Sequence, residues 1–235
     1  MIMLAGRYTL LEQGALDDLL PECERRGVSV VAAGVFNSGL LASERPRDGA
    51  TYDYEAAAAE AAKHMSELLG GKGKVGIVVH DQTSRTGIDR RDGFTEWMKA
   101  NAPGIELLPV QYGGGDQAKS ADIAKSIIAS NPDLKGFYGA NEGSAIGIVK
   151  CVEESGKKGL KIVGFDSGTA QIDAINNGVM AGAITQNPVG MGKELVSSAM
   201  KAIKGEQLPK VIDTGFYWYD KTNIDDPKIQ AVLYQ

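Results

Sequence analysis

Residues 73–101 read Gly-Lys-Val-Gly-Ile-Val-Val-His-Asp-Gln-Thr-Ser-Arg-Thr-Gly-Ile-Asp-Arg-Arg-Asp-Gly-Phe-Thr-Glu-Trp-Met-Lys-Ala-Asn, and this stretch decides the fold. Its first part is a short apolar run, and residues 74–79 are predicted to form a buried strand. After a polar turn, residues 88–101 have the length and pattern of a surface helix. The stretch is therefore one strand–helix unit.

The same alternation continues on both sides of this unit. Further strands are predicted at 6–11, 28–33, 105–110, 134–139, 160–165, 181–185 and 211–219, and helices at 15–26, 54–69, 117–130, 142–155, 169–177 and 189–204. Residues 35–53 are loop-like, and the tail after 219 is expected to be irregular. Strand–helix alternation at this spacing predicts an α/β fold, with a parallel, doubly wound sheet covered by helices on both faces.

The composition excludes several classes of protein. The chain has 235 residues, 43% hydrophobic and 23% charged, with a net charge of −5. This total offers no basic face for nucleic acid, and no apolar run approaches the length of a transmembrane helix. Residues 1–4 lack the features of a signal peptide, so the chain as expressed is expected to be cytoplasmic.

Arginine and lysine are distributed differently along the chain. Residues 1–52 contain five arginines and no lysine, whereas residues 53–235 contain three arginines and seventeen lysines. Arginine and lysine carry the same charge and both suit solvated helix faces, so folding alone does not require such a division. The division indicates two coding histories joined near residue 53.

Polar side chains follow the predicted strands at their carboxyl ends, where open parallel sheets bind ligands. The candidate ligand-binding residues chosen on this basis are Asp81, Arg85, Arg90, Asn141, Asp166 and Gln186. Carboxylates accept hydrogen bonds, guanidinium groups donate them and amides do both, so this set suits a neutral ligand with many hydroxyl groups.

Other motifs predict no catalytic residue, cofactor or metal. The glycine-rich residues 70–74 lack the Gly-Lys-Ser/Thr ending of a phosphate loop. His80, Asp81 and Ser84 include the residue types of a hydrolase triad, but proximity in sequence does not supply triad geometry. Cys23 and Cys151 have no metal or redox spacing, and neither requires a disulfide.

From about residue 54 to 235 the chain resembles the ribose-binding-like sugar-binding proteins of bacterial ABC importers. The resemblance rests on five segments in matching order: 73–79, 89–94, Gly139-Ala-Asn-Glu142, Val163-Gly-Phe-Asp166 and Ile184-Thr-Gln-Asn-Pro188. It implies two α/β lobes that close over a sugar, with Arg90, Asn141, Asp166 and Gln186 among the ligand contacts. It also implies a periplasmic or lipid-anchored parent that delivers a monosaccharide to importer membrane subunits. An aromatic residue that the family places near Gln117 is replaced here by Gly113–Gly115.

Residues 5–52 instead resemble a late segment of an aldo/keto reductase barrel, in its sugar-dehydrogenase branch. Residues 6–13 would be a barrel strand, 16–27 the following helix and 28–41 the next strand with its cofactor-side loop. The catalytic residues that this family carries on earlier elements have no counterpart here. The resemblance therefore implies a chimera without reductase activity, expected to be engineered by fragment exchange, with a natural fusion as the alternative.

Together these resemblances predict one complete lobe and one shortened, rebuilt lobe. The first lobe is expected to comprise 1–72 and 187–210, and the second 73–186 and 211–235. The expected function is a non-catalytic sugar-binding module, with binding weakened or lost because the first lobe lacks half of the ligand shell.

Two alternatives remain: a scaffold without a ligand, and a nicotinamide-dependent sugar dehydrogenase. A transcription regulator would need a helix-turn-helix, which 1–52 do not supply. Exposed strand edges at 6–11 or 28–33 are candidates for homodimer contacts.

Overall fold

The computed structural model describes residues 2–5, 17, 19–28, 30–33, 54–209 and 212–234. The chain divides into two compact units. Unit 1 comprises Met1–Tyr52 and Pro209–Val211, and unit 2 comprises Asp53–Leu208 and Ile212–Gln235. Each unit is described on its own.

Unit 1 contains a small strand–helix–strand element. Strand β1 (Ile2–Ala5) pairs in parallel with β2 (Val30–Ala33), and helix α1 (Leu19–Arg25) lies between them in sequence. Pro21 lies in the first turn of α1, where its missing N–H costs no helical hydrogen bond. Glu22 pairs with both Arg25 and Arg26 at the end of this helix.

Unit 1 agrees with the sequence reading in part. The expected strand at 28–33 is present as β2, and the helix expected at 15–26 appears as α1. Strand β1 was not predicted, because four apolar residues at a chain end fit several structures equally well. The strand expected at 6–11 and the loop expected at 35–53 lie outside the described residues.

Unit 2 is built on a seven-stranded sheet. The strands are β3 (Gly73–Val79), β4 (Ile105–Leu107), β5 (Gln111–Tyr112), β6 (Leu134–Gly139), β7 (Lys161–Phe165), β8 (Gly182–Gln186) and β9 (Phe216–Tyr219). Their order is β4-β3-β6-β7-β8-β9, and β5 continues the edge beside β3. All neighbours pair in parallel except β8 and β9. The predicted α/β class and the mostly parallel sheet are therefore confirmed.

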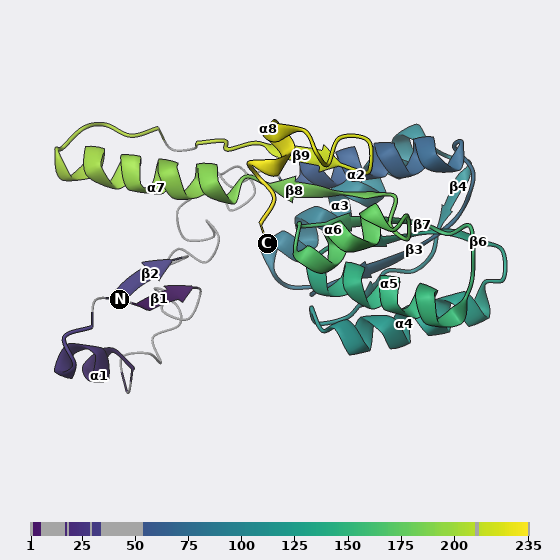
Figure 1. Cartoon of the computed structure of the whole chain (residues 1–235), viewed down its shortest axis with the longest axis horizontal. Helices are drawn as coiled ribbons and strands as arrows, with labels where there is room; N and C mark the ends of the chain where they lie inside the picture. Colours follow the sequence, from purple (N-terminus) through teal and green to yellow (C-terminus); the bar gives the residue numbers. More distant parts are fainter. Residues whose placement is uncertain are drawn as a thin grey trace. The chain divides into compact units, whose positions relative to one another are not determined.

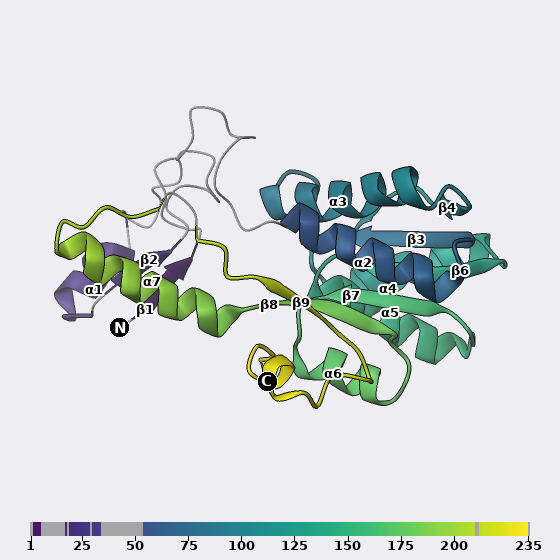
Figure 2. The same cartoon turned by 90° about the horizontal axis from the view of Figure 1, so that it is seen from above.

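Helices cover both faces of this sheet (Figures 1 and 2). Helices α2 (Tyr54–Leu69) and α3 (Arg85–Asn101) pack together on one face. Helices α4 (Gln117–Ser130), α5 (Glu142–Ser155) and α6 (Thr169–Asn176) cover the other. Helix α7 (Pro188–Ile203) follows β8, and the short α8 (Pro227–Gln230) lies in the C-terminal segment.

Two close contacts explain the composition of the α2–α3 layer. Four of the six alanines of α2 are fully buried, and such small side chains let the helix approach its neighbours closely: Ala57, Ala58, Ala61 and Ala62. A Cβ atom at Gly93 of α3 would lie 2.1 Å from the carbonyl oxygen of Glu55, so only glycine fits there. Below the helices, the ring of Phe94 stacks on that of Tyr138 of β6 with 4.0 Å between centroids.

Several boundaries differ from the prediction, including the last strand, which is expected at 211–219 and begins only at Phe216. Residues 53–72 are expected in the first lobe, but α2 packs against α3, β7 and β8 within unit 2, where four of its alanines are buried. The strand expected at 105–110 is divided into β4 and β5, and Pro109 between them has no N–H for the ladder. The tail contains α8, which Asp226 caps by accepting from the Lys228 N–H. The same division places residues 187–208 in unit 2 and Pro209 in unit 1, and the assignment of 187–210 to the first lobe stays a prediction.

None of the helices in the described part of the chain combines the length and apolar character that crossing a membrane requires. The same residues contain no cluster of three or more histidine, cysteine or acidic side chains suited to a metal ion.

Candidate functional site

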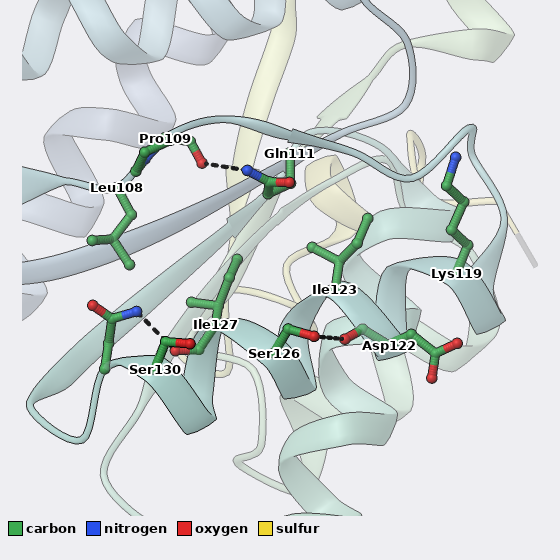
Figure 3. Close-up of a pocket in the computed structure, with 10 residues that line it drawn as sticks. Leu108, Pro109, Gln111, Lys119, Asp122, Ile123, Ser126, Ile127 and Ser130 are labelled. Atoms are coloured by element: carbon green, nitrogen blue, oxygen red, sulfur yellow. Dashed lines mark hydrogen bonds between the residues drawn. The ribbon is translucent and has the colours of Figure 1, made fainter.

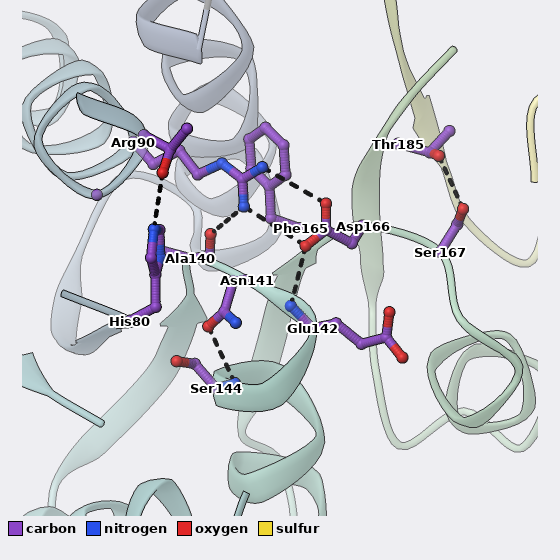
Figure 4. Close-up of polar contacts among 12 residues, drawn as sticks. His80, Arg90, Ala140, Asn141, Glu142, Ser144, Phe165, Asp166, Ser167 and Thr185 are labelled. Carbon is purple, nitrogen blue, oxygen red and sulfur yellow. Dashed lines mark hydrogen bonds and ion pairs between the residues drawn. The ribbon is translucent and has the colours of Figure 1, made fainter. Parts of the chain in front are cut away.

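The carboxyl ends of β3, β6, β7 and β8 lie at one edge of the unit 2 sheet. His80 and Asp81 follow β3, Asn141 follows β6, Asp166 follows β7 and Gln186 ends β8. Helix α3 adds Arg90 to this edge (Figure 4). The sheet therefore brings together polar residues that lie as far apart in sequence as His80 and Gln186.

Arg90 is the centre of this group. Its side chain is 7% exposed, and Nη1 donates to the carbonyl oxygen of Ala140 at 2.8 Å. The guanidinium carbon lies 3.8 Å from the ring centroid of Phe165 and 5.0 Å from that of Tyr54. Two aromatic faces and a carbonyl thus hold the planar cation in place.

Asp166 faces Arg90 from the end of β7. Its two carboxylate oxygens lie 3.4 and 3.5 Å from Nη1 and Nη2 of Arg90, so the pair is long for a direct salt bridge. The Glu142 backbone N–H donates to Asp166 Oδ2 at 3.1 Å. A carboxylate and a guanidinium therefore stand together with hydrogen-bonding capacity unused.

Asn141 and Gln186 flank this pair. Asn141 caps α5, and its Oδ1 accepts from the Ser144 N–H at 3.1 Å (Figure 4). Gln186 forms a side-chain hydrogen bond with Tyr54 at the start of α2, while burial raises the pKa of that tyrosine. A local helix cap thus holds Asn141, and a long-range contact holds Gln186.

Asp81 and Arg85 are engaged in local contacts. Asp81 Oδ1 accepts from the backbone N–H groups of Thr83 and Ser84 at 2.6 and 2.8 Å and from the Thr83 hydroxyl. Burial opposes ionisation of Asp81, but these hydrogen bonds outweigh it and hold its pKa well below the usual range. Arg85 Nε donates to Asp89 at 2.7 Å. Asp81 therefore shapes the turn before α3, and a ligand role for either residue stays a prediction.

The structure adds residues that the sequence reading did not select. His80 Nε2 lies 3.0 Å from the Thr86 hydroxyl, and its buried Nδ1 has no hydrogen-bond partner among the described residues. Burial and the Arg90 charge lower the pKa of His80. Tyr54 and Phe165 contribute the rings around Arg90. His80 followed the same strand as Asp81, so its position was visible in the sequence, whereas the Tyr54 contact depends on long-range packing.

The turn before α4 contains Gly113–Gly115, at the place where the sugar-binding family has an aromatic residue. A Cβ atom at Gly143 would lie 1.9 Å from the Gly115 carbonyl oxygen, so this turn packs directly on the start of α5. At Gly115 a Cβ atom would lie 3.6 Å from Asn141 Nδ2. The backbone, not a ring, therefore borders Asn141 on this side.

A separate open groove of about 520 Å³ runs along α4 (Figure 3). Its lining includes Leu108, Pro109, Ile123 and Ile127, with polar side chains at its rim. It contains none of the six residues selected from the sequence. The groove and the strand-end site are distinct features of unit 2.

Comparison with known proteins identifies the family. Residues 9–207 match the family described as "Periplasmic binding protein domain". The chain is 32% identical to the D-allose-binding periplasmic protein of Escherichia coli K12 over 162 residues, which cover 68% of this chain and 52% of that protein. An ABC transporter solute-binding protein from Agrobacterium vitis, solved with bound D-fucose, superposes with a TM-score of 0.78 at 27% identity. That alignment covers 94% of this chain and 85% of the other.

A doubly wound α/β fold with polar side chains at its strand ends is typical of proteins that bind small molecules. The chain belongs to the periplasmic binding protein family, since the family match covers most of its length. The relatives named so far, which match over most of this chain, are transport binding proteins, in agreement with the expectation that it is non-catalytic. The chain spans between about half and two thirds of the first curated relatives, with 52% and 63% of their lengths matched.

A second, shorter match concerns another family. The chain is 54% identical over 54 residues to D-threo-aldose 1-dehydrogenase of a Pseudomonas species. This match covers 23% of the chain and 16% of that enzyme. The periplasmic family match begins at residue 9, inside the segment for which we expected a reductase origin.

Proposed function

We propose that this chain is a sugar-binding module that holds a neutral monosaccharide at the strand-end site. The observation that carries the proposal is the buried Arg90 guanidinium facing the Asp166 carboxylate at 3.4 and 3.5 Å. A sugar hydroxyl can donate to a carboxylate and accept from a guanidinium at once, and such charge-assisted bonds are the stronger ones. Asn141 and Gln186 are proposed to complete the contacts, with Asp81 and Arg85 as further proposed contacts.

The proposed ligand is neutral because the paired charges of the site already balance. Arg90 faces Asp166, and Arg85 pairs with Asp89. A charged ligand would leave one buried ion without its partner, which is costly. A polyhydroxylated neutral ligand avoids that penalty, and the relatives with sugars in their names support this class.

We further propose weak affinity, because every described residue of the site belongs to unit 2. A site with a single wall leaves much of a ligand in water and gains fewer hydrogen bonds. The protein would bind its ligand without chemistry. By analogy with its relatives it would deliver the sugar to the membrane subunits of an ABC importer, outside the cytoplasm.

Titration calorimetry with a panel of pentoses, hexoses and deoxysugars tests the proposal. We expect saturable binding of at least one sugar with a Kd of about 1 mM, near −4 kcal/mol. Arg90→Met should abolish this binding, since it keeps the stem of the side chain and removes the donors. The absence of heat from any sugar at concentrations well above this Kd would refute the proposal.

We also infer that the segment before residue 53 shares its origin with aldo/keto reductases. The short dehydrogenase match and the change from arginine to lysine near residue 53 support this inference. It predicts no turnover of a sugar with an oxidised nicotinamide cofactor, since the segment lacks a proton donor for the reaction. Turnover that scales with protein concentration would contradict the inference, and an experimental structure of the segment would test the predicted barrel-type geometry.

A further inference from the structure

The backbone at Asp166 is unusual. Its φ angle is 80°, and it is the one non-glycine residue with a positive φ in the described part of the chain. A side chain disfavours this left-handed region, so surrounding contacts must hold the residue there. The position matters because Asp166 presents the carboxylate that faces Arg90.

Hydrogen bonds from three separate segments hold this turn. The Asp166 N–H donates to the carbonyl oxygen of Ile184 at 2.7 Å, and the Tyr219 hydroxyl donates to the Asp166 carbonyl oxygen at 2.8 Å. The next residue is held as well: the Ser167 N–H donates to the Tyr234 hydroxyl at 3.2 Å. The Thr185 hydroxyl donates to Ser167 Oγ at 2.8 Å (Figure 4).

Tyr234 connects this turn to a second part of the site. Its hydroxyl accepts from Ser167 and forms a side-chain hydrogen bond with Glu142, which matches the one donor and two acceptor positions of a phenol. Glu142 in turn donates its backbone N–H to the Asp166 carboxylate at 3.1 Å. The C-terminal segment is anchored close by, since Ile229 and Val232 are buried.

We propose that Tyr219 and Tyr234 are positioning residues, which fix the Asp166 turn so that its carboxylate stands opposite Arg90 before a ligand arrives. This inference rests on the proposed sugar-binding function. Neither tyrosine needs to touch the sugar, because each acts through the backbone of residues 166–167. The C-terminal segment thereby becomes part of the binding apparatus.

Glu142 supplies a signature that a purely structural role would not give. Burial raises the pKa of Glu142, the nearby Asp166 charge raises it further, and the hydrogen bond from Tyr234 opposes both effects. Removing the Tyr234 hydroxyl should therefore raise the pKa of Glu142 again. The Tyr219 hydroxyl bonds only the backbone of Asp166, so its removal should change that pKa less.

The experiment compares Tyr234→Phe and Tyr219→Phe with Tyr217→Phe. Tyr217 lies on the same strand as Tyr219 and is 37% exposed, so its variant is a matched control for loss of a phenol hydroxyl. Three quantities are measured on the full chain: the amide chemical shifts of residues 166 and 167, the titration midpoint of the Glu142 carboxyl carbon, and the Kd of the sugar selected from the panel.

We expect Tyr234→Phe to move both amide shifts and to raise the Glu142 midpoint, and Tyr219→Phe to move mainly the Asp166 shift. Each should weaken sugar binding about five- to tenfold, as expected for loss of one supporting hydrogen bond. Unchanged Kd values in both variants of a sugar-binding protein would overturn the inference. If the parent protein binds no sugar, the proposed function fails separately. The positioning role is then tested by the amide shifts of residues 166 and 167 without ligand. Shifts in Tyr234→Phe and Tyr219→Phe equal to those in Tyr217→Phe would overturn it.

Discussion

At the scale of single residues, Arg90 combines three interactions that lysine cannot reproduce. The planar guanidinium donates to the Ala140 carbonyl, faces both oxygens of Asp166 and stacks on Phe165. A lysine keeps the charge but loses the fork and the flat face.

We therefore predict that Arg90→Lys weakens sugar binding at least about tenfold and lowers the free energy of unfolding by about 1–2 kcal/mol. Calorimetry and urea denaturation measure the two effects. Arg91→Lys is the matched control, because Arg91 pairs with Asp92 and Tyr112 away from this group. Equal affinities for the two variants would show that the Arg90 fork does not contact the ligand.

His80 gives the stability a dependence on pH. In the folded protein, burial lowers the pKa of His80 most, and the Arg90 charge lowers it further. In the unfolded chain a histidine has a pKa of about 6.5. Below that pH the unfolded chain binds the proton more readily, so the stability falls as the pH decreases and is fully present above it.

His80→Asn should remove this contribution. Both proteins should lose free energy of unfolding between pH 7.5 and 5.5, and the variant should lose less, by up to about 1 kcal/mol. The difference is small because the ring is only partly buried. Urea denaturation of both proteins at the two pH values measures the difference, in which all other titrating groups cancel. Parallel losses in the two proteins would contradict the assignment.

At the scale of elements, the contact between α2 and α3 depends on Gly93. A Cβ atom there would lie 2.1 Å from the Glu55 carbonyl oxygen, and backbone cannot move aside without shifting α2. We predict that Gly93→Ala lowers the free energy of unfolding by about 2–4 kcal/mol. Since Tyr54 begins α2, sugar affinity should fall with it.

Gly192→Ala is the matched control for this prediction. Gly192 is also inside a helix, α7, and a Cβ atom there has no described neighbour within 4 Å. Alanine is the better helix former, so this variant should be neutral or more stable by up to about 1 kcal/mol. Thermal and urea unfolding compare the two. A loss of stability as large in Gly192→Ala as in Gly93→Ala would show that helix context, not the Glu55 contact, sets the cost.

The elements also show what a sequence can predict here. The local sequence pattern predicts where each strand ends, and parallel sheets bind ligands at the carboxyl ends of their strands. These two points were enough to predict one shared edge for four residues: Arg90, Asn141, Asp166 and Gln186. Tyr54 was not found, since its contact with Gln186 depends on how α2 packs within unit 2. Asp81 was selected as a ligand group, but the pattern does not reveal that the next turn already uses its carboxylate.

At the scale of the whole molecule, the positions of the two tryptophans allow the unfolding of one unit to be followed by fluorescence. The chain has two tryptophans, and both belong to unit 2: Trp97 lies in α3 and Trp218 in β9. Trp218 stacks on His64 with 3.9 Å between ring centroids and donates to Asp220 at 2.8 Å. Tryptophan emission during unfolding therefore reports the loss of unit 2 structure.

A ligand that binds folded unit 2 must raise its stability by mass action, whatever unit 1 does. At a sugar concentration one hundred times Kd, the increase is about 2.7 kcal/mol. We predict that the free energy of unfolding measured by tryptophan emission rises by this amount with the selected sugar. It should stay unchanged in Arg90→Met, which lacks the donors of the site. A rise of the same size in Arg90→Met would instead place the sugar elsewhere on unit 2, because linkage detects binding wherever it occurs in the folded unit.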